Sequence, residues 1–412
     1  MSFTLFILLI VVLLGRPQDF FPGLAPLRLA LVVTAATVAA TVFEKKTVAM
    51  GEFFKARESR TYAFLYLAMI IGIPFAYHRR QAFDYVLVSY LPNLLFYYLF
   101  LSQVDTVKRM KTVIFAICVS TLFYSLLSLR MGSYSADRLS FGTMYDPNDL
   151  AYFLVSLFPL SILFIVRPET WVRKTVAIAA VGVAVVTILL TGSRGGLIGL
   201  VGVLMMFFIT SGSIRWSHKI LLTVLAAAMI VMYSDRINTE RYLSLANVES
   251  DYNVSGQSGR LDIWKNGLRL FLANPLTGVG VNCFPNALGD LRASEGAIPK
   301  WQVSHNSYLQ MAAEVGVVGL FLFLSLIITC RRSFAAALQH EPMDGTRIEL
   351  AAIAQVLQIG FAGLLITAFF LTQAYSILFT LFFAFSAQMT SIRSTQQDES
   401  AAPYSAPEGE TR

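Results

Sequence analysis

The sequence predicts an all-α membrane protein with about twelve transmembrane helices. Of its 412 residues, 56% are hydrophobic and only 14% are charged, and the mean hydropathy is +0.63. A soluble domain carries about 25% charged residues. The apolar residues fall into runs that approach the roughly 20 residues needed to cross a bilayer, where a helix satisfies its own backbone. The composition excludes a soluble globular enzyme, a disordered chain and a coiled coil.

Twelve apolar runs are bounded by charge clusters and by Pro or Gly turns. The first and the eighth run are short for a span. The first is also similar to a signal peptide, but its positive residue, Arg16, follows the apolar run, so we expect an uncleaved span. The predicted spans are 3–14, 27–43, 61–77, 83–101, 112–129, 150–166, 175–190, 197–210, 220–233, 307–329, 350–371 and 375–392.

These spans form one predicted transmembrane domain, residues 1–392. A long loop at about 234–304, with short amphipathic helices, is inserted between the ninth and tenth spans. The polar tail 393–412 is expected to be disordered. With the N-terminus inside, eighteen Lys and Arg fall in inside loops and six in short outside loops. This bias predicts that both termini are cytoplasmic and that the long loop lies on the outer face.

Several kinds of chemistry lack support in the sequence. Cys118, Cys283 and Cys330 are too few and too scattered for a disulfide framework or a thiolate metal site. There is no P-loop, no H-E-x-x-H and no D-x-D run, so we expect neither a metal nor a cofactor. The net charge of +7 is read by loop rather than as a sign of nucleic-acid binding, which we do not expect.

Arg194 is the first candidate site residue, in the run Thr191-Gly-Ser-Arg-Gly-Gly between two apolar segments. An Arg at the bilayer centre costs about 2.5–3.5 kcal/mol, and less near the interface, so an anionic partner is expected. A guanidinium fork matches phosphate, and the adjacent glycines let an anion approach the backbone. The alternative is an interfacial Arg beside a helix-packing face of Gly195, Gly199 and Gly202.

A second candidate, Arg260, begins an expected amphipathic helix in the long loop, capped by Ser258 and ended by Asn274-Pro275. A cation in the first turn of a helix opposes the helix dipole, so an anionic partner would help there. The alternative is a surface helix with a solvated Arg. Trp264 suits a membrane interface. The expected apolar stripe consists of Leu261, Trp264, Leu268, Phe271 and Leu272.

His305 and Arg138 complete the candidates. His305 lies where the long loop enters the tenth span, and its imidazole would accept a proton near neutral pH. Its alternative is a capping or hydrogen-bonding histidine. Arg138 precedes a segment in which Asn148 or Asp149 is expected to cap the next helix, and it would add positive charge to an outer site.

In order along the chain, S-R-G-G, R-x-x-x-W, N-P-x-x-G-x-G and H-N-x-Y-L-x-x-x-x-E-x-G-x-x-G span about residues 191–319. This order resembles the O-antigen ligase and polymerase superfamily. The segment 138–149, with Gly142, and Arg16-Pro-Gln-Asp19 are similar to the ligase-like branch. The resemblance implies a metal-independent, inverting glycosyltransferase on the periplasmic face of the bacterial inner membrane. Its donor would be a glycan on undecaprenyl pyrophosphate, and its acceptor a hydroxyl of lipid A–core, protein or another glycan.

The same resemblance carries functional roles onto Arg194, Arg260 and His305. The arginines would bind the pyrophosphate, with Arg138 as a helper, and His305 would act as general base or position the acceptor. One alternative is a polymerase that joins lipid-linked repeats, since nothing in the sequence names the acceptor. The non-enzyme alternative is a polysaccharide transporter or flippase, which would place ionisable residues near the midplane of the membrane, often in matched halves.

Overall fold

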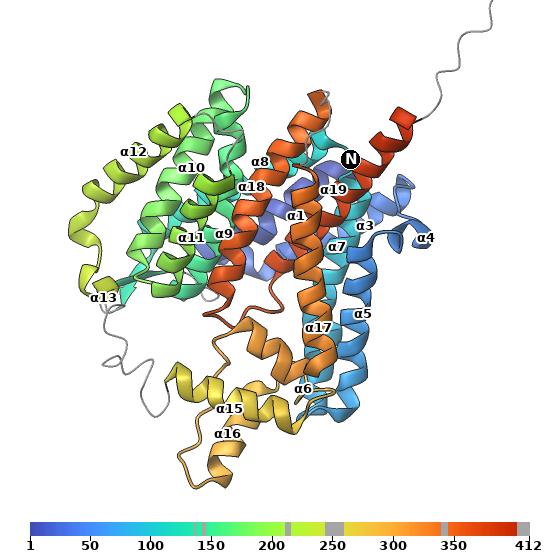
Figure 1. Ribbon diagram of the computed structural model, residues 1–412, viewed down its shortest axis with the longest axis vertical. Coiled ribbons are helices and arrows are strands. Elements are labelled where there is room, and N and C mark those ends of the chain that lie inside the picture. The colour runs from blue at the N-terminus through green and yellow to red at the C-terminus, as the bar shows by residue number, and fades with distance from the viewer. Residues whose placement is uncertain (136, 142–145, 211–215, 244–258, 339–344, 402–412) are drawn as a thin grey trace, which may run out of the picture.

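A computed structural model describes residues 1–135, 137–141, 146–210, 216–243, 259–338 and 345–401. They form a bundle of helices, and a smaller group of helices lies across one end of it (Figure 1). Each predicted span coincides with a helix. Seven stretches of the described residues are long and apolar enough to cross a membrane, and Ser2–Gly15 and Arg194–Thr210 are shorter apolar helices. The protein is therefore a polytopic helical membrane protein, while the count of twelve spans stays a prediction.

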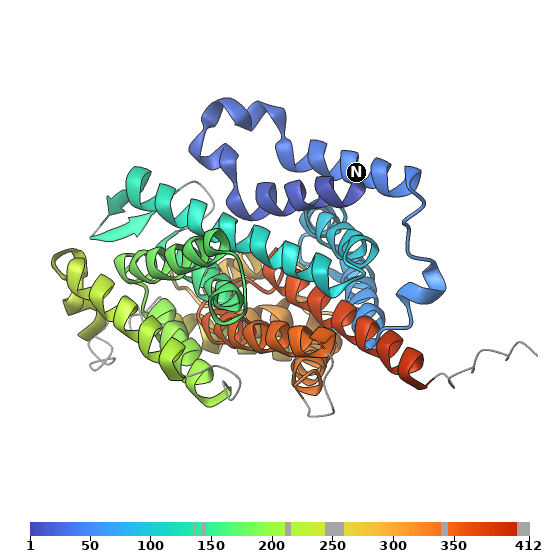
Figure 2. The same cartoon turned by 90° about the horizontal axis from the view of Figure 1, so that it is seen from above.

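The first third of the chain forms a hairpin and three further long helical stretches. Helix α1 packs against α3 and α8, and Figure 2 shows α1 and α3 at one edge of the bundle. A π-helical segment, η3, joins α6 to α7. The elements are α1 Ser2–Gly15, α2 Pro17–Phe20, η1 Pro22–Leu27, α3 Leu29–Phe43, α4 Met50–Phe53, α5 Arg57–Gly72, η2 Ile73–Phe75, α6 Arg79–Asp84, η3 Tyr85–Tyr90, α7 Leu91–Gln103 and α8 Val107–Met131.

The middle of the chain holds the centre of the bundle. A short antiparallel hairpin, absent from the all-α prediction, pairs Ser135 with Arg138 and Ser133 with Ser140. Helix α9 is the most enclosed candidate span: 89% of its apolar window is buried, against α8, α10, α11 and α18. The elements are β1 Ser133–Ser135, β2 Arg138–Ser140, α9 Pro147–Val166, α10 Trp171–Leu190, α11 Arg194–Thr210, α12 Trp216–Met232, η4 Ser234–Arg236 and α13 Thr239–Leu243.

The last third contains the long loop and three further helices. Helix α17 is not continuous, because Gly316 inside it has φ 74° and ψ −168°. Helix α19 continues through the start of the predicted disordered tail as far as Ala401, since no glycine or proline interrupts the sequence before Pro403. Residues 402–412 lie outside the described residues. The elements are α15 Arg260–Ala273, α16 Phe284–Ser294, α17 Ser307–Ala336, α18 Gly345–Ala368 and α19 Ile377–Ala401.

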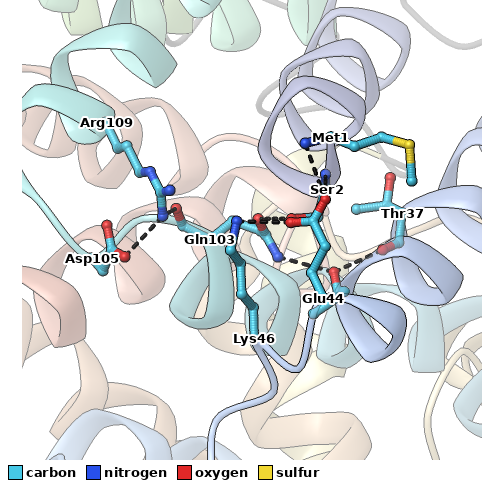
Figure 3. Close-up of polar contacts among 9 residues, drawn as sticks. Met1, Ser2, Thr37, Glu44, Lys46, Gln103, Asp105 and Arg109 are labelled. Carbon is cyan, nitrogen blue, oxygen red and sulfur yellow. Dashed lines mark hydrogen bonds and ion pairs between the residues drawn. The ribbon is translucent and has the colours of Figure 1, made fainter.

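The two ends of the bundle differ in content. We call one the Met1 end; it holds Met1, and α19 finishes on the same side (Figure 1). Figure 3 shows the Glu44 carboxylate there between the Met1 amino group at 3.0 Å, the Ser2 hydroxyl at 2.7 Å and Lys46 at 2.7 Å. We call the other the loop end. It holds α13, α15, α16 and the starts of α9, α11 and α17 (Figure 1).

Candidate functional site

The turn between α10 and α11 carries Arg194 at the loop end. Gly192 supplies a left-handed residue with φ 58°, which closes the turn without steric cost. The Ser193 hydroxyl accepts a hydrogen bond from the Gly196 N–H at 3.1 Å and so caps α11. The same hydroxyl donates to Asn148 Oδ1 at 2.9 Å, which ties the turn to the start of α9.

The glycines after Arg194 serve helix packing. A Cβ on Gly199 would lie 2.3 Å from Thr367 Cγ2, and one on Gly202 would lie 2.2 Å from Ile366 Cδ1. A Cβ on Gly195 would meet Phe370 Cβ at 3.0 Å. The small residues therefore let α11 approach the C-terminal part of α18, as the helix-packing alternative predicts. This close packing also fixes the position of Arg194, the first residue of α11, relative to α18.

Two further arginines enclose the same turn. Arg138 Nε donates to Thr191 O at 3.0 Å, and its Nη2 donates to Asn148 Oδ1 at 2.8 Å. Arg241, from α13, donates through Nε to Gly192 O at 2.9 Å, and its own carbonyl accepts from Arg194 Nε at 3.3 Å. A Cβ on Gly192 would lie 3.3 Å from the side chains of both Arg138 and Arg241. The turn between α10 and α11 therefore lies between the side chains of Arg138 and Arg241.

The start of α9 corrects one expectation. The helix begins at Pro147 rather than Leu150, and its cap is Asp146, not Asn148 or Asp149. Asp146 Oδ1 accepts the N–H groups of Asn148 at 2.7 Å and Asp149 at 2.9 Å. Proline is favoured at the first position of a helix because it needs no donor there, and this moves the start three residues upstream. Asn148 is free to accept from Arg138 and Ser193 instead.

Part of the segment 138–149, including Gly142, lies outside the described residues. Phe141, at its beginning, stacks on Phe20 with ring centroids 4.3 Å apart. Arg16 pairs with Asp19 at 2.6 Å just before Phe20. The Arg16-Pro-Gln-Asp19 run therefore braces the connection after α1 against the exit of the β-hairpin that carries Arg138.

Helix α15 places Arg260 in its first turn, as expected, with Gly259 as the cap residue; Ser258 lies outside the described residues. The expected apolar stripe is not the face of α15 that packs on the protein. Leu261, Leu268 and Leu272 are exposed, while the buried side consists of Ile263, Asn266, Gly267 and Leu270. The reason is close approach. A Cβ on Gly267 would lie 2.8 Å from Leu309 and 3.0 Å from Phe284, so α15 packs against α16 and α17 through the face that carries this glycine.

Trp264, which the sequence predicts at a membrane interface, also makes contacts within the protein. It is half-buried, packs on Phe369 at 5.4 Å between ring centroids, and donates from Nε1 to Ser304 O at 3.1 Å. Ser304 immediately precedes His305. Trp264 therefore links the helix that carries Arg260 to the residue that carries the imidazole.

His305 is not the cap of α17. Asn306 is the cap, because its side chain accepts the N–H groups of Tyr308 at 2.9 Å and Leu309 at 3.0 Å. His305 has φ 47°, a left-handed conformation that a non-glycine residue rarely adopts and that often marks a functional position. Its N–H donates to Thr372 Oγ1 at 2.8 Å. Among the described residues, no hydrogen bond engages the His305 ring.

The three predicted residues are brought together. Burial, and then the positive charge of Arg194, lower the pKa of Arg260, and Arg241 adds to this effect. Burial, and then the positive charge of Arg260, lower the pKa of His305 below its ordinary value of 6.5, while Asp146 opposes them. Burial and Arg241 lower the pKa of Arg138 to about 10. We call Arg138, Arg194, Arg241, Arg260 and His305 the cationic cluster.

A backbone pairing fixes the geometry of the loop against α17. After Asn274-Pro275, the chain runs beside the break at Gly316: Val317 N–H donates to Pro275 O at 2.8 Å, and Val279 N–H donates to Ala313 O at 2.8 Å. Gly278 and Gly316 both have positive φ, and a Cβ on either would lie within 2.4 Å of the opposing backbone. The N-P-x-x-G-x-G run is therefore a docking strand for the broken helix.

Glu314 lies beside this pairing and is 2% exposed. Its carboxylate accepts from Tyr375 at 2.8 Å, from the Phe284 N–H at 3.1 Å and from the Asn282 backbone. Two hydrogen bonds therefore join α17 to the α18–α19 connection: Tyr375 donates to Glu314, and Ser307 Oγ donates to Leu371 O at 2.7 Å. The connection 369–376 thus holds both His305, through Thr372, and Glu314, through Tyr375.

This arrangement can hold a diphosphate and accept a proton. Guanidinium groups brought together against their mutual repulsion provide stabilisation for a divalent or trivalent anion, and a neutral imidazole beside them can act as a base. Within the described residues, no three His, Cys, Asp or Glu side chains group so that they would hold a metal ion.

Sequence reasoning missed Arg241, Asp146, Thr372 and Glu314 as parts of the site. Arg241 stands in a short polar helix without any pattern, and the sequence favours Asn148 or Asp149 over Asp146 as the helix cap. Glu314 is part of the H-N-x-Y-L-x-x-x-x-E-x-G run, so its place beside a helix-breaking glycine was the available signal for it.

A model of the O-antigen ligase family matches residues 179–324. This stretch includes Arg194, Arg241, Arg260, His305 and Glu314, together with the docking strand and the break in α17. Arg138 and Asp146 precede it. No curated protein matches the chain.

Proposed function

From the match of residues 179–324 to the O-antigen ligase family and from the cationic cluster, we propose that the protein transfers a glycan from undecaprenyl pyrophosphate to an acceptor hydroxyl. The family implies a glycosyl-transfer enzyme that acts in lipopolysaccharide or polysaccharide biosynthesis. The donor, the acceptor and the roles of single residues are our proposal. The observation that supports it most is the gathering of four arginines beside one imidazole at the loop end.

The arginines stabilise the leaving group. As the glycan departs, negative charge builds on the diphosphate oxygen that was bonded to the sugar. Preorganised guanidinium groups at that position lower the barrier because they need no reorganisation when the charge develops. Arg194 and Arg260 bind the diphosphate, and Arg241 extends the same positive surface. Arg138 adds charge and holds the turn, since two of its nitrogens already donate to Thr191 and Asn148.

His305 acts on the other reactant. The acceptor oxygen attacks the anomeric carbon, the bond from that carbon to the diphosphate oxygen breaks, and the acceptor proton passes to the imidazole. The products are the glycosylated acceptor, with inverted anomeric configuration, and undecaprenyl pyrophosphate. A lowered pKa keeps His305 neutral at pH 7, which is the form that accepts a proton.

The energy for the reaction is already stored in the donor, so no nucleotide is consumed. The polyprenyl chain lies among the apolar helices while its diphosphate stays at the membrane surface. We assign the loop end to the periplasmic face of the bacterial inner membrane and both termini to the cytoplasm, in line with the Lys and Arg bias of the loops.

Reconstitution tests the reaction. The full chain is placed in vesicles with a purified undecaprenyl-pyrophosphate-linked glycan and candidate acceptors, with no nucleotide and with a chelator of divalent metals. Mass spectrometry then identifies the acceptor that gains sugar. A product on lipid A–core or protein supports a ligase, and a lengthened lipid-linked glycan supports the polymerase alternative. Absence of transfer to every acceptor class contradicts the proposal.

A topology experiment tests the face. A reporter inserted near Asn253 should report the periplasm, and one inserted near Lys55 should report the cytoplasm. The reverse result would place the cationic cluster on the wrong side for a lipid-linked donor that is presented in the periplasm.

A further inference from the structure

A second polar cavity lies at the loop end, outside the cationic cluster. Its volume is about 570 Å³, within the range usual for small-molecule sites. One wall comes from α6 and the π-helical segment after it, and the other from the turn that leads into α16. The lining residues are His78, Arg79, Arg80, Gln81, Asp84, Tyr85, Ser89, Asn282 and Asn286.

The walls of this cavity are fixed to each other. Gln81 Nε2 donates to Asn282 O at 2.6 Å across the two walls. Just outside the cavity, Tyr77 N–H donates to Val279 O at 2.8 Å, so the docking strand is also hydrogen-bonded to the residue that precedes His78. Asn282 itself has φ 61° and is held from behind by Glu314. The cavity is therefore built by the same pairing that positions the candidate site.

Its charge favours anions. Arg79 and Arg80 are exposed, and the one acidic group among the lining residues, Asp84, approaches Arg80 only to 3.8 Å, with both side chains largely in solvent. Such an exposed pair leaves most of the positive field intact. Gln81, Ser89, Asn282 and Asn286 add amide and hydroxyl groups, which hydrogen-bond to sugar hydroxyls.

Another cavity at the loop end provides a contrast. It measures about 560 Å³ and is lined by Tyr134, Asp137 and the segment 235–239. Its charged lining residues are Asp137, Asp235 and Arg236, so acids outnumber bases. The two cavities are equal in size but opposite in charge balance, and only the first suits an anionic ligand.

The cavity lined by Arg79 and Arg80 is linked to His305 by contacts of the α18–α19 connection. The ring of Tyr85, in the cavity wall, lies 5.5 Å from the ring of Tyr375. Tyr375 is three residues after Thr372, whose hydroxyl receives the N–H of His305. The α18–α19 connection therefore contacts both a wall of this cavity and the segment that carries His305.

We propose that this cavity binds an anionic sugar, bearing a phosphate or a carboxylate, that belongs to the acceptor. The inference rests on the proposed function, because it assigns the second reactant of the same site. The diphosphate donor is drawn to the cationic cluster, where more arginines meet. A separate cationic cavity, lined with groups that recognise sugar hydroxyls, then selects the molecule that receives the glycan.

Binding can be measured without any turnover. The full chain in nanodiscs of phosphatidylcholine is titrated with glucose 6-phosphate, glucose and inorganic phosphate, and calorimetry gives each affinity. Four variants are compared with the wild type: Arg79→Gln with Arg80→Gln, Arg79→Lys with Arg80→Lys, Arg194→Gln with Arg260→Gln, and Arg130→Gln. The last removes an exposed arginine at the end of α8, outside both sites.

We expect glucose 6-phosphate to bind more tightly than glucose or inorganic phosphate. The Gln pair at 79 and 80 should weaken it by about tenfold or more, as expected for the loss of charged hydrogen bonds. The Lys pair should keep most of the affinity, and Arg130→Gln all of it. In the transfer assay, the Gln pair should raise the KM for the acceptor and leave the KM for the donor unchanged.

Three outcomes overturn the proposal: equal affinity for glucose and glucose 6-phosphate, inorganic phosphate binding as tightly as the sugar phosphate, or binding lost only in the Arg194 and Arg260 pair. Failure of the proposed function is seen separately. A chain that binds glucose 6-phosphate at the cavity but transfers no glycan would keep the cavity as a sugar-phosphate site and contradict the enzymatic role.

Discussion

Positive charges at the Met1 end and in the cationic cluster at the loop end have different surroundings among the described residues. At the Met1 end, Lys111 lies 2.8 Å from both Glu169 and Glu349, and Arg167 lies 2.7 Å from Glu349. In the cationic cluster, Arg138 donates to a backbone carbonyl and a side-chain amide, and Arg194 and Arg241 each donate to a backbone carbonyl. Burial, and then the positive charge of Arg241, lower the pKa of Arg138. Ion pairs with carboxylates stabilise the fold, whereas several arginines held near one another favour the binding of an anion.

The largest effect on the transfer rate is expected from substitutions in the cationic cluster at the loop end. Arg194→Ala or Arg260→Ala should lower the rate of glycan transfer by about 10²–10³, the loss usual for removing a preorganised charge-stabilising donor. Arg→Lys at the same positions should recover part of the rate, because the charge stays but the bidentate fork is lost. The measurement is the initial rate in reconstituted vesicles at equal amounts of folded protein. Wild-type rates in both alanine variants would remove the basis of the proposed mechanism.

The docking strand offers the next largest effect. Gly316→Ala places a Cβ 2.3 Å from Leu276 O at a residue with φ 74°, so the pairing with the loop must yield at a cost of about 1–3 kcal/mol. We expect a lower thermal midpoint and a transfer rate reduced well beyond the loss of folded protein. Gly345→Ala is the matched control, because no heavy atom lies within 4 Å of its Cβ. Equal thermal midpoints and transfer rates in the two variants would show that the docking strand contributes neither to stability nor to the proposed activity.

Thr372 tests how the imidazole is positioned. Thr372→Val removes the hydroxyl that receives the His305 N–H and should lower kcat by about tenfold, the cost of a single lost hydrogen bond at a strained residue. Thr372→Ser keeps the hydroxyl and should restore kcat. Because Thr372 is a positioning residue, the KM of the donor should change little. A raised donor KM with normal kcat would assign Thr372 to binding instead.

Asp146 sharpens the electrostatic side of the comparison. Its carboxylate raises the pKa of His305, against burial and Arg260, which lower it. Asp146→Asn keeps a good helix cap but removes the charge, so the pKa of His305 should fall further. The neutral base then persists to lower pH, and the acidic limb of the pH–rate profile should move to lower pH. A shift to higher pH, or none, would separate His305 from the rate-determining proton transfer.

The smallest effect on activity is expected at the Met1 end. Arg167→Gln breaks the pair with Glu349, whose side chain is 23% exposed, and should cost about 1 kcal/mol of stability. The thermal midpoint should fall by roughly 2 °C, while the transfer rate per folded molecule stays unchanged. Loss of turnover at constant folding would show that the two ends are coupled.

The sequence predicts the helices well because apolar runs and lipid leave the backbone few choices. It also points to Arg194 and Arg260, since charge at a span boundary or helix start is costly without a partner, and to His305 as an imidazole where the long loop enters a span; the roles of these three residues stay predictions. It does not indicate which face of α15 packs on the protein, because the close approach of Gly267 to Leu309 and Phe284 decides this and leaves three leucines exposed. It fails as well on Arg241 and Thr372, whose importance depends on contacts between segments far apart in the chain.

The hydroxyl that holds His305 belongs to Thr372, which follows it by 67 residues. Helices α17 and α18 must therefore both be packed before the imidazole can take up its strained conformation. The conformation of His305 is thus a property of the assembled bundle and not of the loop that carries it, and an intermediate without a packed α18 would hold Arg194 and Arg260 but no positioned imidazole.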